Sequence, residues 1–413
     1  MINIGEVLLN LWNTSGFAAL STGFFNAGGW QNLVMIIIAC GLLYLGIVKK
    51  FEPLLMVGIA FGCLLTNLPM GGLYHQELWT AFMDHNSEFY HSYGAIMREG
   101  GLLDILYIGV KTSIYPCLIF MGVGAMTDFG PLLSNPKSLL LGAAAQMGVF
   151  VAFFGAVALN LISPALGFTG PEAASIGIIG GADGPTAIFL TSKLAPHLLG
   201  AIAVAAYSYM SLVPIVQPLC IKAITTKKER CIRMKYEPAQ VSKTTRILFP
   251  ILVTMVAGLA APDAAILIGF LMFGNLLREC GVLNSLSETA SNVLANLITL
   301  VLGLSVAYKM QAADFLTLNT LVIMGLGLVA FIFDTFGGVA FAKLLNLFLK
   351  DKINPMIGAA GISAFPMSSR VVHKLGREED PYNYLLMHAA GANVSGQIAS
   401  VIAGGLIMML VVV

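Results

Sequence analysis

Long, uninterrupted apolar runs constrain this chain more than any other feature of its sequence. They are continuously apolar and do not alternate, which excludes a transmembrane β-barrel. The runs lie near residues 33–48, 54–70, 105–124, 138–162, 198–222, 246–262, 264–278, 292–308, 317–333 and 385–413. Marginal or interrupted stretches near 173–194 and 336–375 complete the set. The sequence therefore predicts an all-α polytopic membrane protein with about 10–11 membrane segments in a lipid bilayer.

Composition and motifs exclude several classes of protein. Charged residues make up 10% of the chain, against about 25% in a typical soluble domain. The formal net charge of +1 offers no electrostatic basis for binding nucleic acid. The cysteines are scattered without a CxxC pair, which argues against a zinc site, a haem attachment or a disulfide scaffold. The absence of a GxxxxGK[ST] motif argues against ATP hydrolysis by this chain.

Two polar segments lie between the apolar runs, and the charge of one of them predicts the orientation of the chain in the membrane. The loop 222–246 is rich in lysine and arginine, so the positive-inside rule predicts that it is cytoplasmic. The segment 71–101 contains His75, His85 and His91 at irregular spacing. We interpret that segment as a solvated connector, and no transition-metal site is expected there.

Two stretches interrupt the apolar pattern in a related way. Residues 176–196 read IGIIGGADGPTAIFLTSKLAP, and the central glycines and proline would break a helix at membrane depth. The stretch 354–376, NPMIGAAGISAFPMSSRVVHKLG, aligns with it so that Gly180 matches Gly361 and Pro185 matches Pro366. We therefore predict two inverted repeats, each with a broken helix.

An upstream likeness supports the repeat, since MTDFGPLLSN at 126–135 resembles LRECGVLNSL at 277–286. The predicted division is 1–101 for the N-terminal membrane segments and polar connector, 102–222 for the first repeat with broken helix 173–194, 223–246 for the basic cytoplasmic loop, and 247–413 for the second repeat with broken helix 354–375.

Broken helices in corresponding halves of a chain point to a transport site. The backbone groups that such a break frees are tolerated only where they are buried in protein or line a cavity. Asp183 lies in the first break, and an intramembrane carboxylate is a functional candidate by default. The free carbonyls and this carboxylate together suit Na⁺.

Other polar residues near the breaks have two interpretations each. Asn354 could cap a helix or bind an ion, whereas Ser363 favours an ion ligand because it precedes the position equivalent to Asp183. Arg370 could anchor the topology or bind an anionic substrate. Tyr209 could be an interfacial residue, or it could act as a proton donor or ion ligand. For Asn393 we expect a functional role in addition to close helix packing.

Two charged residues, Asp334 and Lys343, lie in an apolar neighbourhood. For them we expect structural ion pairs with other helices.

Four long stretches resemble one known family. They are YLGIVKKFEPLLMVGIAFGCLLTNLP (44–69), FMGVGAMTDFGPLLSNPKSLLLGAAAQ (120–146), the stretch 176–218 and NPMIGAAGISAFPMSSRVV (354–372). They resemble the beta subunit of biotin-dependent sodium-pumping decarboxylases, a family that includes oxaloacetate, methylmalonyl-CoA, glutaconyl-CoA and malonate decarboxylases. The segment 71–101 departs from the family by being longer and more polar, so the resemblance does not select one sister enzyme.

The resemblance implies a translocase, in which this membrane subunit decarboxylates carboxybiotin, consumes a proton and exports Na⁺. It implies catalytic roles for Asp183, Tyr209 and Arg370. The implied Na⁺ ligands are Asp183, Asn354, Gly358, Ser363 and Asn393, and the implied carboxybiotin ligands are Arg370 and Ser363.

The resemblance also implies partners and a location. Biotin would arrive on a partner, because this chain has no Met-Lys-Met acceptor motif. The implied partners are a carboxyltransferase alpha subunit, a biotin carrier protein or domain, a small membrane gamma or delta subunit and further beta subunits, in a bacterial inner membrane. The alternatives are a Na⁺-coupled secondary transporter or Na⁺/H⁺ antiporter without decarboxylation chemistry, and a passive structural subunit.

Overall fold

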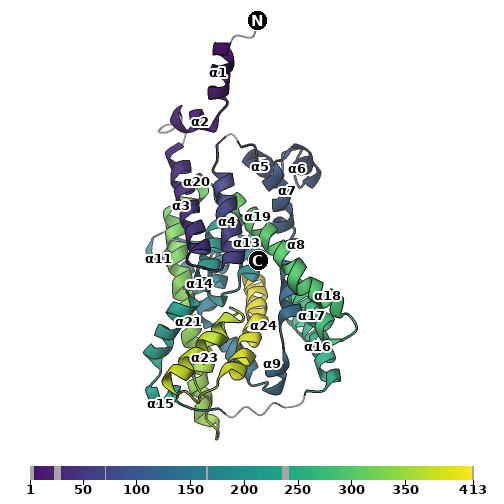
Figure 1. Ribbon diagram of the computed structural model, residues 1–413, viewed down its shortest axis with the longest axis vertical. Helices are drawn as coiled ribbons and strands as arrows, with labels where there is room; N and C mark the ends of the chain where they lie inside the picture. The colour runs from purple at the N-terminus through teal and green to yellow at the C-terminus, as the bar shows by residue number, and fades with distance from the viewer. Residues whose placement is uncertain (1–3, 23–28, 70, 164–165, 235–240, 412–413) are drawn as a thin grey trace.

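The structure is a computed structural model that describes residues 4–22, 29–69, 71–163, 166–234 and 241–411. Within these residues every regular element is helical. Seven helices are long and apolar enough to cross a membrane, or eight if one bent pair counts as a single span. The prediction of an all-α polytopic membrane protein is therefore confirmed, and the other predicted segments are short or broken helices. The molecule is elongated, with α1 and α2 projecting at one end and α15 at the other (Figure 1).

The helices before the first broken stretch are α1 (Ile4–Asn13), α2 (Gly16–Thr22), α3 (Gly29–Ile47), α4 (Pro53–Thr66), α5 (Gln76–Met83), α6 (Tyr93–Glu99), α7 (Leu102–Lys111), α8 (Ile114–Met126), α9 (Gly130–Ser134), α10 (Ser138–Ala144) and α11 (Met147–Ile162). The first broken stretch consists of α12 (Gly170–Gly177), a 3₁₀ turn (Ile178–Gly181) and α13 (Gly184–Leu194). The following helices are α14 (Leu199–Ile224), α15 (Lys227–Arg230), α16 (Lys243–Ala260), α17 (Ala265–Glu279), α18 (Asn284–Glu288), α19 (Ala295–Val306) and α20 (Ala312–Phe315). The chain ends with α21 (Leu318–Phe348), α22 (Met356–Ala359), α23 (Met367–Glu379) and α24 (Leu386–Val411).

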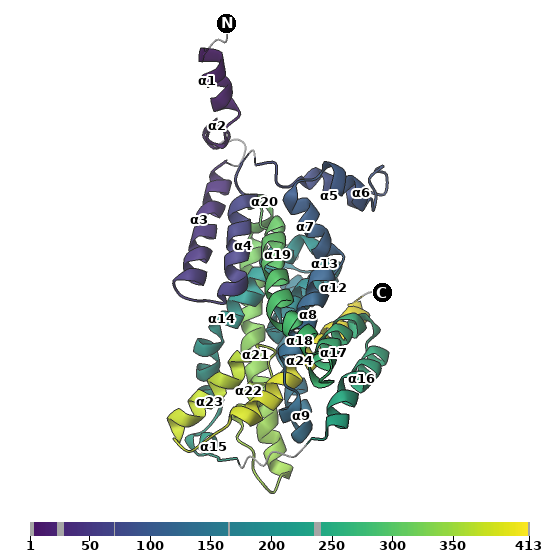
Figure 2. The same cartoon turned by 45° about the vertical axis from the view of Figure 1, so that its right-hand side comes forward.

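The broken stretch α12–α13 lies inside the molecule. It packs against α7, α8, α11, α14, α21 and α24, and Figure 2 shows α12 and α13 beside α7 and α8. All of Ala173–Gly184 is buried. Because surrounding helices exclude lipid, the backbone groups freed by the break face protein, which is the condition for a break at membrane depth.

The long helix α21 extends beyond the end that the sequence predicted for it. A span was expected to end near 333 and a broken element to follow from 336, but the chain stays helical to Phe348. The glycines in that region permit close helix crossing without interrupting α21. A Cβ on Gly337 would lie 2.6 Å from Ala144 O, and one on Gly338 would clash with Gly358 O. The break of the second repeat therefore begins only after α21.

The segment 71–101 connects α4 to α7 and is exposed over much of its length, as expected of a solvated connector, although part of it is helical and packed. It forms α5 and α6, and Trp79 and Phe82 are buried. The Trp79 ring meets the Tyr107 ring edge-on at 4.9 Å, and its Nε1 donates to Asp104 Oδ1 at 2.9 Å. Burial of the Trp79 ring against α7 orders this part of the segment despite the polarity of its sequence.

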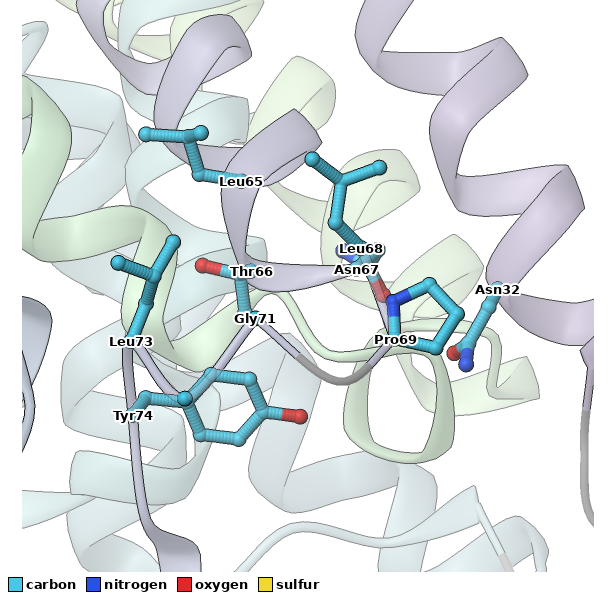
Figure 3. Close-up of a pocket in the computed structure, with 10 residues that line it drawn as sticks. Asn32, Leu65, Thr66, Asn67, Leu68, Pro69, Gly71, Leu73 and Tyr74 are labelled. Carbon is cyan, nitrogen blue, oxygen red and sulfur yellow. The ribbon is translucent and has the colours of Figure 1, made fainter. Parts of the chain in front are cut away.

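The turn after α4 joins that helix to the segment before α20. Asn67 donates to Cys63 O and Met310 O, and it accepts from Ala312 N. A small cavity of about 150 Å³ lies beside this turn, with Pro69 and Tyr74 at its border (Figure 3). These contacts stabilise the end of the molecule opposite α15.

Candidate functional site

The first break places a carboxylate at the start of a helix. Ala182 has a left-handed φ of 50°, which ends the 3₁₀ turn, and Asp183 is the N-cap of α13. The Asp183 side chain accepts from Thr186 N at 3.3 Å. Aspartate is a preferred N-cap and proline is favoured in the first helical turn, so Asp183 and Pro185 explain why α13 begins here. The predicted break near 180–185 is confirmed.

The second break meets the first. Between α22 and α23 the chain is irregular, and Ser363 N donates to Gly181 O at 3.0 Å. The Ser363 hydroxyl donates to Asp183 Oδ2 at 3.2 Å, and the Ser400 hydroxyl of α24 donates to the same oxygen at 2.8 Å. Asp183 is 6% exposed. The prediction that the two breaks meet is confirmed, whereas the inverted relation of the repeats and the domain division stay predictions.

Two further oxygens border this meeting point without a donor. Within the described residues, Gln146 Oε1 and Asn393 Oδ1 are buried and have no hydrogen-bond partner. A Cβ on Gly181 would lie 3.2 Å from Gln146 Oε1, and Asn393 Nδ2 donates to Ile362 O at 2.6 Å, beside Ser363. An unpaired buried acceptor costs about 1–3 kcal/mol. A desolvated cation would satisfy both acceptors, because it binds oxygens alone.

The two tyrosines of α14 differ in position. The Tyr207 ring and hydroxyl lie directly against the Gly184 backbone, where they leave no room for a Cβ. The Tyr209 hydroxyl donates to Met324 O of α21, and its ring lies against Gly327. Tyr207 is therefore the tyrosine beside the Asp183 segment, although Tyr209 was the candidate from the sequence.

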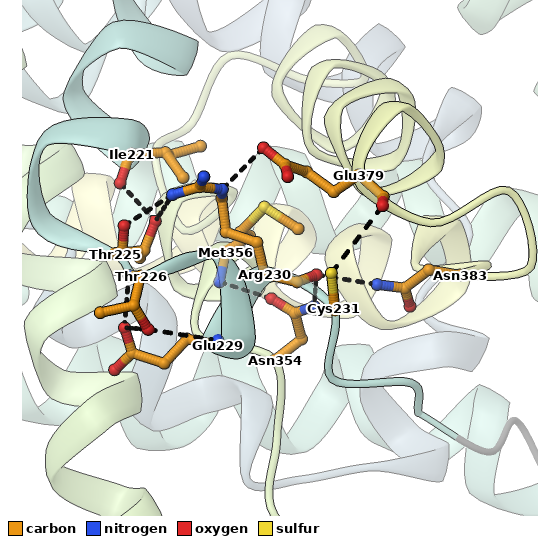
Figure 4. Close-up of polar contacts among 10 residues, drawn as sticks. All are labelled: Ile221, Thr225, Thr226, Glu229, Arg230, Cys231, Asn354, Met356, Glu379 and Asn383. Carbon is orange, nitrogen blue, oxygen red and sulfur yellow. Dashed lines mark hydrogen bonds and ion pairs between the residues drawn. The ribbon is translucent and has the colours of Figure 1, made fainter.

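Asn354 and Gly358 lie in a different set of contacts. Asn354 Nδ2 donates to Arg230 O at 2.8 Å and to Ile232 O at 2.9 Å, and its Oδ1 accepts from Met356 N at 3.1 Å (Figure 4). Of the two interpretations left open by the sequence, this geometry favours the structural one. Gly358 packs its backbone against Gly338 of α21.

The basic segment after α14 is held on α23. Arg230 Nε lies 2.8 Å from Glu379 Oε1, and Asn383 Nδ2 donates to Arg230 O at 3.0 Å (Figure 4). Arg233 forms a two-pronged pair with Asp380, at 2.5 and 3.0 Å, and the hydrogen bond from Arg233 lowers the pKa of Asp380. Residues 235–240 of this predicted cytoplasmic loop lie outside the described residues, and its last residues, from Lys243 on, form the first turn of α16.

The expectation of ion pairs for Asp334 and Lys343 is half confirmed. Lys343 Nζ lies 3.0 Å from Glu229 Oε1. Within the described residues Asp334 pairs with no cation, and its Oδ1 accepts from Gly148 N and Val149 N. Asp334 thus caps the N-terminus of α11, whose positive end stabilises the carboxylate.

Arg370 lies in the first turn of α23 and is exposed. In the part of the chain that the structure describes, its guanidinium forms no hydrogen bond or ion pair. The group is therefore available to an anion that approaches from outside the protein.

The missed residues of the site are Ser400, Gln146 and Tyr207. Ser400 and Tyr207 belong to hydroxyl-bearing stretches that are visible in the sequence, but spacing alone could not show which of their hydroxyls faces the break. Gln146 carried no signal of its own, because it lies in the short interval between α10 and α11.

Comparison with known proteins gives a consistent family. The family described as the Na⁺-transporting oxaloacetate decarboxylase beta subunit matches residues 31–411. The chain is 52% identical to methylmalonyl-CoA decarboxylase subunit beta of Propionigenium modestum, over 98% of this chain and 99% of that protein. It is 48% identical to glutaconyl-CoA decarboxylase subunit beta of Acidaminococcus fermentans, over 98% and 97% of the two chains. It is 49% identical to the oxaloacetate decarboxylase beta chain of Klebsiella pneumoniae, over 94% and 96%.

Proposed function

The chain belongs to the family of Na⁺-transporting oxaloacetate decarboxylase beta subunits, and we propose that it exports Na⁺ through the meeting point of its two broken helices while it decarboxylates carboxybiotin. It is a membrane subunit of a sodium-pumping decarboxylase. The three relatives are named for different substrates at similar identity, so we propose no particular acid as the source of the carboxyl group.

The Asp183 cluster is the observation that carries this proposal. A buried carboxylate, hydroxyls from Ser363 and Ser400, and the unpaired oxygens of Gln146 and Asn393 gather where two backbones are interrupted. Na⁺ is a hard cation that prefers oxygen ligands, and the carboxylate offsets the charge of an ion that has left water. We propose these five side chains as the ion's ligands.

The chemistry needs a proton at the same place. In carboxybiotin the bond between the ureido nitrogen and the carboxyl carbon breaks, CO₂ leaves, and the electron pair stays on the ureido group. A proton then neutralises that group. We propose that a tyrosine hydroxyl of α14 relays this proton, and the position of Tyr207 against Gly184 makes it the better candidate than Tyr209.

The carboxybiotin side of the reaction would lie toward the basic end of the molecule. A cavity of about 700 Å³ opens there between α9, the start of α24 and the segments 232–234 and 351–353, with Arg233 and Lys352 in its lining. By the positive-inside rule this end is cytoplasmic. We propose that a biotin carrier approaches here, from a complex that also contains a carboxyltransferase subunit and a small membrane subunit in the bacterial inner membrane. Arg370 is our candidate for contact with the carboxylate, because its planar fork suits that geometry.

The central test replaces Asp183. In the reconstituted complex, Asp183→Asn is expected to abolish Na⁺-dependent decarboxylation while the subunits still co-purify, because a desolvated cation would lose compensation of several kcal/mol. The matched control is Asp128→Asn, since Asp128 only accepts from Gly130 N in a turn and asparagine keeps that acceptor. Na⁺-stimulated turnover that survives Asp183→Asn would refute the proposal.

A second arm separates the substrate from the ion. Arg370→Lys keeps the charge but loses the two-pronged donor, so it should slow carboxybiotin turnover on the order of tenfold without shifting the Na⁺ concentration at half-maximal rate. Avidin should inhibit the wild-type complex. A Na⁺/H⁺ antiporter without decarboxylation chemistry would be unaffected by avidin, and that result would favour the alternative.

A further inference from the structure

A second cavity, with a mostly apolar lining, lies far from the basic segment. It has a volume of about 350 Å³ and is formed by α5, the C-terminal end of α7, the turn Pro196–Leu198 and Lys309. Figure 2 shows α5 and α7 at the end of the molecule opposite α15. The function proposed above makes no use of this cavity.

Two lysines with unneutralised charges line this cavity. Lys111 and Lys309 are half-buried, and among the described residues neither forms a salt bridge. Asp314 attracts Lys309 more strongly than Lys111 repels it, and Lys309 Nζ also lies 5.2 Å from the centre of the Tyr308 ring. His197, also in the lining, is already paired with Glu172 at 2.7 Å. The lining therefore contains two ammonium groups without a salt-bridge partner among the described residues.

The one buried carboxylate close by cannot serve these lysines. Asp104 Oδ1 accepts from His75 N and Trp79 Nε1, and its Oδ2 accepts from Gly101 N at 2.8 Å and lies 3.0 Å from His75 Nδ1. Asp104 is fully buried and does not line the cavity. Asp104 therefore leaves both lysines free to pair with an anion from outside the protein.

The floor of the cavity is aromatic and rigid. Trp79 and Tyr107 line it, and Tyr107 stacks on Tyr308 with 4.7 Å between ring centroids. Within the described residues the Tyr107 hydroxyl is buried without a hydrogen-bond partner.

The cavity lies where apolar helices end. α19 ends just before Lys309, and α14 begins at Leu199, next to the turn that lines the cavity, whereas Lys111 lies at the bend between α7 and α8. Tryptophan, tyrosine and lysine at the ends of membrane helices mark the interface, where phospholipid phosphates lie. Two ammonium groups beside aromatic rings at that depth suit a phosphate, which lysine binds as a point charge.

We propose that this cavity binds a phosphate group through Lys111 and Lys309, on the face of the membrane opposite the basic segment. The phosphate comes either from a phospholipid headgroup or from free phosphate. The half-apolar lining accepts the glycerol part of a lipid, and inorganic phosphate needs only the lysines.

The test uses the full chain in neutral detergent with Trp79 as its only tryptophan. The sequence contains three tryptophans, so Trp12→Phe and Trp30→Phe leave Trp79 as a reporter within the cavity. Phosphatidylglycerol and inorganic phosphate are titrated separately, and Trp79 emission is recorded. We expect a saturable change, and Lys111→Gln/Lys309→Gln should weaken binding about tenfold or more.

The controls separate charge from folding. Lys227→Gln/Lys228→Gln removes two exposed lysines of α15 at the other end and should leave the titration unchanged. Lys111→Arg/Lys309→Arg keeps the charges and should retain binding, even if the glutamine pair fails to fold. Saturation by phosphatidylglycerol alone identifies a lipid site, and saturation by inorganic phosphate identifies a free-phosphate site. No saturable response to either probe in the wild type, or loss of binding in the arginine pair with the fold intact, overturns the proposal.

Discussion

One carboxylate oxygen of Asp183 accepts hydrogen bonds from two hydroxyl groups that lie far away in the sequence. Ser363 and Ser400 both donate to Oδ2, while Oδ1 accepts from the backbone of α13. A serine hydroxyl donates one hydrogen bond and keeps lone pairs that can coordinate a cation. The same groups can therefore hold the carboxylate when the ion is absent and join its coordination when it is present.

Ser400 offers a sharp test, because α24 contains a matched serine. Ser400→Ala removes the 2.8 Å hydrogen bond to Asp183, and a bond to a charged group contributes about 1.5–3 kcal/mol. We expect the Na⁺ concentration at half-maximal decarboxylation to rise about tenfold or more. Ser395 is equally buried but donates to Ser138 O, so Ser395→Ala should leave that concentration unchanged. Equal shifts in both variants would place Ser400 outside the ion site.

The tyrosines of α14 provide a second test at this scale. Tyr207→Phe is expected to slow decarboxylation by about two orders of magnitude, the usual range for loss of a general acid, because its hydroxyl lies beside the Asp183 segment. Tyr209→Phe loses a hydrogen bond to Met324 O and should mainly lower stability, by about 1 kcal/mol. Turnover and melting temperature, measured for both variants, separate the two roles. A larger turnover loss in Tyr209→Phe would restore the assignment implied by the sequence resemblance.

At the scale of the elements, glycines let the broken stretches approach the helices around them. Gly396 of α24 packs against Gly361 O of the second break. A Cβ added to Gly361 would lie 2.7 Å from Leu141 O of α10. Asp334 of α21 caps α11, which fixes where that helix begins and so where Gln146 lies. The proposed ion site thus depends on α10, α11 and α21 as well as on the elements that carry its ligands.

Gly396→Ala should disturb the second break. The added methyl meets backbone that cannot rotate away, so we expect a destabilisation of about 1–3 kcal/mol and a weaker response to Na⁺. Gly325→Ala is the control, because its Cβ would meet nothing within 4 Å and α21 is helical there. That variant should keep its activity and gain up to about 1 kcal/mol of stability. Melting temperature and Na⁺ titration check both, and a neutral Gly396→Ala would contradict the close packing.

At the scale of the whole molecule, the Asp183 cluster that we propose as the ion site joins the two halves of the chain. Asp183 precedes Ser363 and Ser400 by more than a hundred residues, so a bound ion stabilises only the folded arrangement. At a Na⁺ concentration of about 100 times its dissociation constant, the stabilisation would be about 2.7 kcal/mol. NaCl should therefore raise the melting temperature of the purified chain more than choline chloride at equal ionic strength. Asp183→Asn should lose this difference and Asp128→Asn should keep it. An identical response to the two salts in the wild type would exclude Na⁺ binding to the folded chain.

The sequence by itself determined the membrane helices, both breaks and the carboxylate between them. These follow from local rules, because a lipid-facing backbone must be helical and a Gly-Gly-Ala-Asp-Gly-Pro run cannot continue a helix. The tertiary structure alone decided which polar side chains meet Asp183. Tyr207 and Tyr209 are two residues apart on α14 and point to roughly opposite sides of it, so only the packing of α14 decides which one faces the break. Likewise Asn354 contacts the basic segment at Arg230, and Trp79 packs against Tyr308, because the fold brings partners distant in sequence together.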